Sequence, residues 1–96
     1  MSALEEDAGW QRLDKFLFFA RFCKTRAIAA ALIEKGAVRI NRQPTEKPHA
    51  KLRPDDVLTL PLPQGVKVVR VKLLARRRGP AAEARHLYDE LDDELA

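Results

Sequence analysis

The feature that most constrains the fold of this chain is a change of hydrophobic period at Gly36. Before Gly36, apolar residues recur at i, i+3, i+4 and i+7, the spacing of one helix face. After it, apolar and polar residues alternate as they do along a half-buried strand. Helices followed by strands, instead of the two in regular alternation, predict an α+β domain. The helical stripe consists of Leu13, Phe16, Leu17 and Ala20, and the first alternation of Val38, Arg39 and Ile40.

A second helix is expected over residues 26–35, because both of its ends carry boundary signals. Thr25 offers a side-chain oxygen suited to an N-cap. Gly36 can adopt the left-handed backbone that often follows a helix. The predicted apolar stripe of this helix is Ile28, Ala31 and Leu32. The link between the two helices is short, so we expect them to pack side by side.

Strands are expected over residues 38–40, 57–60 and 66–73, where alternation is bounded by glycine and proline. Residues 41–44 are expected to form a turn and residues 44–50 a loop. Pro61 is expected to end the second strand, because proline cannot donate a ladder hydrogen bond. Pro80 suits the first position of a last helix, which we predict over residues 81–95.

The charges are strongly segregated along a chain whose 96 residues fit one domain. Residues 1–10 carry −3, residues 11–53 carry +8, residues 54–78 carry +4 and residues 79–96 carry −5. We therefore expect an acidic flexible tail over 1–10, a basic folded domain over 11–79 and an acidic helix over 80–96. A basic body between acidic ends is typical of a surface that meets polyanions, although an evenly solvated surface is the alternative.

Nothing in the sequence indicates an enzyme, a metal site or a cofactor. There is no Gly-rich phosphate loop, and His49 and His86 have no serine or cysteine beside them. Cys23 is the only cysteine; it is either a reactive thiol next to Lys24 or, as we favour, a small buried apolar residue. The acidic N-terminus and the lack of an apolar run of about 20 residues predict a cytoplasmic protein with no membrane partner.

The candidate binding site lies between residues 12 and 42 and is rich in arginine and lysine. Lys24, Thr25 and Arg26 stand at the start of the second helix, where free backbone N–H groups favour phosphate. We expect the other cations to join them, with Thr25 and Asn41 hydrogen-bonding to the backbone or sugar of a bound nucleic acid. The complete predicted set is Arg12, Lys15, Arg21, Lys24, Thr25, Arg26, Arg39, Asn41 and Arg42.

The same residues resemble the RNA-binding domain named after small-subunit ribosomal protein S4. The resemblance rests on Arg12-Leu13-Asp14-Lys15-Phe16-Leu17, Arg21, Lys24-Thr25-Arg26-Ala27, the run from Leu32 to Asn41, and Asp56-Val57-Leu58-Thr59-Leu60. It implies that residues 11–79 form two packed helices on a small, bent antiparallel sheet, with a C-terminal helix beyond. The strand 66–74, the basic run 76–78 and the segment from Pro80 to Tyr88 resemble the stand-alone heat shock protein 15 family. That likeness implies binding to ribosomal RNA of a free large subunit, in the rescue of stalled subunits.

Two positions depart from the family pattern. The family usually has glycine where this chain has Arg42, and often glycine where it has Asp55. Glycine tolerates positive φ at little cost, so either these turns differ or the two side chains carry strain.

Our hypothesis is a non-catalytic, monomeric binder of structured RNA, either rRNA or tRNA, that reads RNA shape more than base sequence. A DNA-binding module is an alternative, although the basic residues do not follow one helix face. A protein-interaction adaptor that uses the acidic C-terminal segment is another, and an enzyme's accessory fragment acting in trans is a third.

Overall fold

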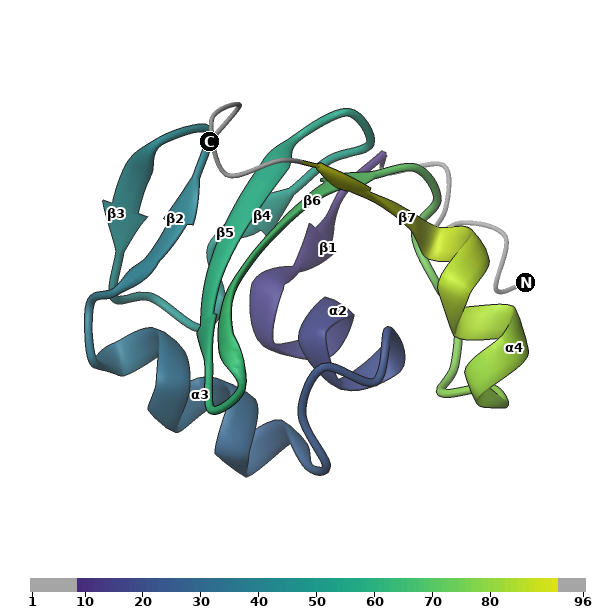
Figure 1. Cartoon of the computed structure of the whole chain (residues 1–96), viewed down its shortest axis with the longest axis horizontal. Coiled ribbons are helices and arrows are strands. Elements are labelled where there is room, and N and C mark those ends of the chain that lie inside the picture. Colours follow the sequence, from purple (N-terminus) through teal and green to yellow (C-terminus); the bar gives the residue numbers. More distant parts are fainter. Residues whose placement is uncertain (1–8, 92–96) are drawn as a thin grey trace.

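The computed structural model describes residues 9–91; residues 1–8 of the predicted acidic tail 1–10, and residues 92–96, lie outside this range. A five-stranded antiparallel sheet, ordered β3-β2-β5-β6-β7, curves around the two N-terminal helices (Figure 1). The predicted α+β class and the two packed helices on a bent sheet are confirmed. The sheet strands are β2 (Val38–Ile40), β3 (Gln43–Thr45), β5 (Val57–Leu62), β6 (Gly65–Val71) and β7 (Tyr88–Leu91).

The first helix, α2 (Leu13–Phe19), buries the predicted stripe completely. These apolar side chains pack against inward-facing residues of the sheet such as Leu58 and Val69. Helix α2 has only seven residues. So short a helix is not stable alone, and the buried stripe holds it in place.

The second helix, α3 (Arg26–Glu34), begins at the predicted cap. The Thr25 Oγ1 accepts a hydrogen bond from the Ile28 backbone N–H at 3.0 Å, and Gly36 has φ +83° just past the helix. The predicted apolar stripe is wrong, because Ala29 and Ile33 are the buried residues and Ile28 is 50% exposed. Helix α3 thus packs into the core through Ala29 and Ile33.

A second, two-stranded sheet lies beside the first helix. It pairs β1 (Gln11–Arg12) with β4 (Lys51–Leu52). The chain then enters α2 with two further bonds to the same loop, from Leu13 N–H to the Ala50 carbonyl (2.9 Å) and from Asp14 N–H to the Pro48 carbonyl (3.0 Å). The predicted loop over residues 44–50 is wrong at its start, because residues 44 and 45 belong to β3, which forms a hairpin with β2.

The strand β5 continues through Pro61, contrary to prediction. On one side, β5 pairs with β6 along its whole length, including Pro61 with Val66. On the other side, the ladder with β2 reaches only Leu58 and Thr59. Pro61 thus lies where β5 has become an edge strand, and proline is tolerated at an edge.

The predicted helix over residues 81–95 is wrong at residues 88–91, which form a strand, and residues 92–95 lie outside the described range. Helix α4 (Ala81–Ala84) and a 3₁₀ turn, η1 (Arg85–Leu87), are followed by β7, which pairs antiparallel with β6. Tertiary contacts explain this outcome, since the ring of Tyr88 packs on Phe22 with centroids 4.7 Å apart. Among residues 9–91, no helix has the length and apolar character needed to cross a membrane.

Candidate nucleic-acid interface

A buried carboxylate organises the basic residues at the start of both helices. Asp14 is 4% exposed, and it is the one charged side chain buried in the described range. Arg12 donates from Nε to Asp14 Oδ1 (3.0 Å) and from Nη2 to Oδ2 (2.9 Å). The Arg26 guanidinium lies 3.5 Å from Oδ2, and the Lys15 backbone N–H donates to Oδ1 at 2.7 Å. One carboxylate therefore holds one arginine at the start of α2's segment and one at the start of the second helix, α3.

Opposing influences act on the pKa of Asp14. Burial raises it, but the hydrogen bonds from Arg12, the charges of Arg12 and Arg26, and the Lys15 N–H outweigh burial and hold the pKa below its ordinary value. Asp14 therefore stays ionised at neutral pH. Its two arginine partners remain 43% and 44% exposed, so each can still face a ligand.

The start of α3 presents the predicted phosphate site. Lys24, Thr25 and Arg26 are all exposed there. The Thr25 hydroxyl oxygen accepts the Ile28 N–H, which leaves the Arg26 and Ala27 N–H groups and the positive end of the helix dipole for a ligand. Ile28 is exposed beside these cations, so an apolar contact is available next to the charged ones.

The other end of α2 is also basic. Arg21 adopts φ 67°, and its Nε donates to the Gly79 carbonyl at 2.7 Å. Arg78 donates from Nε to the Phe18 carbonyl (3.1 Å) and places its guanidinium 4.9 Å from the centre of the Phe18 ring. A cation at a helix C-terminus interacts favourably with the helix dipole. The basic run 76–78 thus ends, at Arg78, against the helix that carries part of the predicted site.

The hairpin between β2 and β3 uses Asn41 as a structural clamp. Asn41 Nδ2 donates to Asp56 Oδ1 (2.9 Å), and Asn41 Oδ1 accepts from the Val57 N–H (2.9 Å). The other Asp56 oxygen accepts from the Arg53 N–H at 2.8 Å. Both polar ends of the Asn41 amide are therefore engaged within the protein. This geometry accounts for Asn41 as a residue that positions Arg42.

Arg39 lies on the other face of the sheet from the helices. Val38 is fully buried beneath them, and side chains of adjacent strand residues point to opposite faces. The predicted set therefore divides in two. One group surrounds the helix ends (Arg12, Lys15, Arg21, Lys24, Thr25, Arg26), and the other belongs to the hairpin (Arg39, Asn41, Arg42).

Two cations that sequence reasoning missed link these groups. Lys51 is the cross-strand partner of Arg12, and its Nζ lies 4.9 Å from the centre of the Trp10 ring. Arg53 follows one residue after β4 and is tied to the hairpin through Asp56. No sequence signal could have found them, because strands of two residues have no detectable period. We call the helix-end group together with Lys51, Arg53 and Arg42 the basic strip.

The chemistry of Cys23 follows from its burial. Cys23 belongs to the hydrophobic core, and burial raises the pKa of its thiol above the ordinary value. A raised pKa leaves little thiolate at neutral pH, so the reading as a small buried apolar residue agrees with the structure. Within residues 9–91, no three His, Cys, Asp or Glu side chains are grouped so that they could hold a metal ion.

Comparison with known proteins adds a family to this geometry. The S4 domain model matches residues 11–58, which include every residue of the predicted site. This chain belongs to the S4 domain family. The match ends within β5, so β6, α4 and β7 lie beyond the matched S4 region.

Within the S4 family, this chain is a relative of heat shock protein 15. It is 43% identical over 86 residues to heat shock protein 15 of Escherichia coli K12, and 41% identical over 87 residues to the Haemophilus influenzae homolog. These alignments cover 90% and 88% of this chain but only 64% and 63% of the relatives. The Vibrio cholerae heat shock protein 15 structure matches with a TM-score of 0.80 at 35% identity, covering 85% of this chain and 82% of that chain. That structure is described as trimeric.

Proposed function

We propose that this chain is a non-catalytic binder of structured RNA. Its target in this proposal is ribosomal RNA of the large subunit, bound in the cytoplasm during rescue or recycling of stalled subunits under heat stress. Membership of the S4 family and relationship to heat shock protein 15 support this proposal. The large-subunit role is the one that the resemblance in the sequence implies.

One observation carries the proposal, namely the pre-ordered arginines around Asp14 beside the N-terminus of α3. A carboxylate that fixes Arg12 and Arg26 reduces the freedom that these side chains lose on binding phosphate. Lys15 and Lys24 make no ion pair with any residue in the described range, so both are available to phosphates. The surface thus combines ordered and free cations.

The exposed face of α3 favours recognition of shape over base sequence. Ala27, Ile28 and Ala31 lie exposed along it between Arg26 and Glu34, and the side chains of these three cannot hydrogen-bond to a base edge. A DNA-reading helix needs polar side chains along the face that enters the groove. Small apolar residues suit close approach to sugar and backbone, which is how structured RNA is usually read.

The described acidic side chains of β7 favour RNA binding over the adaptor alternative. Glu90 pairs with Lys67 at 3.0 Å, and Asp89 lies 3.6 Å from Lys72. Both described acidic side chains of β7 therefore have partners on the neighbouring part of the same chain. These carboxylates pair with lysines of β6 and of the residue that follows it, within the same chain.

Charge reversal at Lys24 tests the RNA surface most cleanly. Arg26 is less suitable, because a glutamate there would face Asp14. We expect Lys24→Glu to weaken binding of a structured rRNA fragment roughly tenfold, equivalent to about 1.4 kcal/mol. Arg85→Glu is the matched control, since Arg85 is exposed on η1, outside the basic strip. Fluorescence anisotropy measures both, and equal losses for the two variants would contradict the assigned surface.

Sedimentation with ribosomal particles tests the target. We expect the full chain to migrate with free large subunits at moderate salt and Lys24→Glu to stay at the top of the gradient. If the wild-type protein binds the RNA fragment but not the subunit, RNA binding stands and the large-subunit target is wrong.

A further inference from the structure

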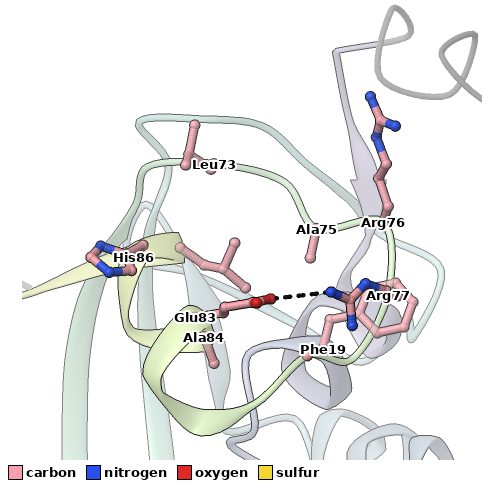
Figure 2. Close-up of a pocket in the computed structure, with 10 residues that line it drawn as sticks. Phe19, Leu73, Ala75, Arg76, Arg77, Glu83, Ala84 and His86 are labelled. Carbon is pink, nitrogen blue, oxygen red and sulfur yellow. Dashed lines mark hydrogen bonds and ion pairs between the residues drawn. The ribbon is translucent and has the colours of Figure 1, made fainter.

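A pocket of about 330 Å³ lies between the end of α2 and the C-terminal segment. Figure 2 shows it bounded by Phe19 from α2, by the loop after β6 and by α4. Its walls are mainly apolar and include Phe19, Leu73, Ala75 and Leu87. Small-molecule pockets begin at about this volume, so it has room for one flat ring system.

Leu73 distinguishes this pocket from an ordinary surface depression. Its side chain is 56% exposed, one of three large apolar residues so exposed in the described range. Phe19 is only half-buried and forms the aromatic wall. An apolar, aromatic-walled hollow beside the arginine run 76–78 combines a stacking surface with positive charge.

An ion pair joins two residues that line the pocket, Arg77 and Glu83. Arg77 Nη2 lies 3.4 Å from Glu83 Oε1, and Figure 2 marks this contact. The two side chains are 70% and 61% exposed, so solvent screens the pair and it exchanges easily for other partners. When the pair opens, the guanidinium can contact a phosphate and the carboxylate can accept hydrogen bonds inside the pocket.

We propose that this pocket holds one unstacked guanine base of the bound RNA. The inference rests on the proposed RNA-binding function and adds a single-stranded base site to it. The base would stack on Phe19, and its phosphate would contact Arg77. Guanine presents two adjacent N–H donors on its Watson–Crick edge, which match the two oxygens of the Glu83 carboxylate. Proteins commonly read unpaired RNA bases through such stacking and edge contacts.

The pocket continues the basic strip. Gly79 lines the pocket, and its carbonyl accepts the hydrogen bond from Arg21 Nε at 2.7 Å. Arg21 is exposed in the loop that leads into α3, three residues before the exposed Lys24. An RNA strand that leaves a duplex over the start of α3 would therefore pass Arg21 and meet Arg77 next.

Two measurements on the full chain test the pocket. The first is a methyl NMR titration with 5′-GMP and 5′-AMP at millimolar concentration. We expect GMP to shift the methyl signals of Leu73, Ala75 and Ala84 more than AMP does, because adenine lacks the two adjacent donors. Shifts with an acetylated Leu-Asp dipeptide and none with GMP would overturn the proposal in favour of a peptide ligand.

The second measurement compares one rRNA hairpin with blunt ends against the same hairpin with a 3′ guanosine or uridine overhang. We expect the guanosine overhang to tighten binding about tenfold in wild-type protein, equivalent to about 1.4 kcal/mol. Phe19→Leu should lose the gain, because it removes the ring but keeps an apolar side chain. Glu83→Gln should lose the preference for guanosine over uridine. Both variants should bind the blunt hairpin normally.

The outcomes separate the two proposals. If blunt and overhanging hairpins bind equally well, the pocket proposal fails and the RNA-binding function stands. If neither hairpin binds, the proposed function fails, and the GMP titration still decides whether the pocket accepts a base. Glu83 is exposed and outside the core, so its variant keeps the test valid even if Phe19→Leu unfolds.

Discussion

Four non-glycine residues in the described range adopt positive φ, and two of them are arginines of the predicted site. Arg21 has φ 67° and Arg42 has φ 71°, while Asn41 and Asp55 have 52° and 78°. Asparagine and aspartate tolerate this conformation, but an arginine there costs about 1–2 kcal/mol. Both positions that depart from glycine, 42 and 55, therefore adopt positive φ, and Arg42 carries the strain. An arginine that is kept in a strained conformation indicates that its positive charge contributes to binding.

Replacing Arg42 with glycine separates strain from charge. We expect Arg42→Gly to raise the free energy of unfolding by about 1 kcal/mol, because the left-handed turn is relieved. RNA affinity should fall at the same time, with a shallower salt dependence, because one phosphate contact is lost. Chemical denaturation and anisotropy measure the two effects. Arg42→Lys should recover affinity without the gain in stability; a stabilised Lys variant would argue against strain.

Asp14 gives the acid sensitivity of the fold a defined source. Its pKa is lowered in the folded protein, so its contribution to stability is complete above the unfolded pKa of about 3.9. That contribution is lost as the pH falls through the folded pKa. We expect Asp14→Asn to destabilise the protein by about 1–3 kcal/mol at pH 7. The difference from wild type should shrink toward pH 3 in denaturation experiments, and a constant difference would exclude the carboxylate as its cause.

At the scale of elements, β7 forms one edge of the sheet and anchors the C-terminal segment. Tyr88 contributes through its ring contact with Phe22, whereas Glu90 contributes an exposed ion pair. We expect Tyr88→Ala to cost about 2 kcal/mol, less than the roughly 3–5 kcal/mol of a fully buried aromatic residue. Glu90→Gln should cost less than about 1 kcal/mol. Thermal unfolding compares them, and the reverse order would mean that charge, not packing, holds β7.

The elements predicted from sequence are those with a clear period and a defined boundary. The α2 stripe and the Thr25 cap were both readable because local chemistry specifies them. The orientation of α3 was not, because Ala29 and Ile33 form as good a helical stripe as Ile28 and Leu32. The choice depends on how closely the neighbouring helix can approach.

The arrangement of the site residues depends on the same tertiary contacts that decide the fold. Alternation along the strand shows that Arg39 and Val38 point to opposite faces of the sheet. It does not show which of the two faces the helices and Arg26 lie on. Lys51 pairs with Arg12 across two-residue strands, which are too short to give a recognisable sequence pattern. The acidic segment 88–91 reads as a helix by composition, yet pairing with the free edge of β6 decides it. Contacts between distant segments thus set what local sequence leaves open.

At the scale of the whole molecule, the exposed apolar residues bear on oligomeric state. Ile28 lies on α3, Val66 on β6 and Leu73 in the following loop. Because they belong to separate elements, they do not suggest one contiguous interface. We expect the free protein to be monomeric in light scattering at micromolar concentration. A trimer, the state described for the Vibrio cholerae relative, would show that this chain assembles in a similar way and would correct the prediction.

The charge segregation of the chain makes the salt dependence of binding its most direct whole-molecule property. Ion pairs with Glu90 and Asp89 occupy Lys67 and Lys72, and the basic strip holds eight of the sixteen remaining Lys and Arg residues. With about five phosphate contacts, the logarithm of the binding constant should fall with the logarithm of salt with a slope near −4. Arg85→Glu should keep that slope, because it lowers net charge outside the strip, whereas Lys24→Glu should reduce it by about one. Anisotropy between roughly 50 and 200 mM KCl covers the informative range. A slope near zero would mean that the strip does not bind the phosphates at all.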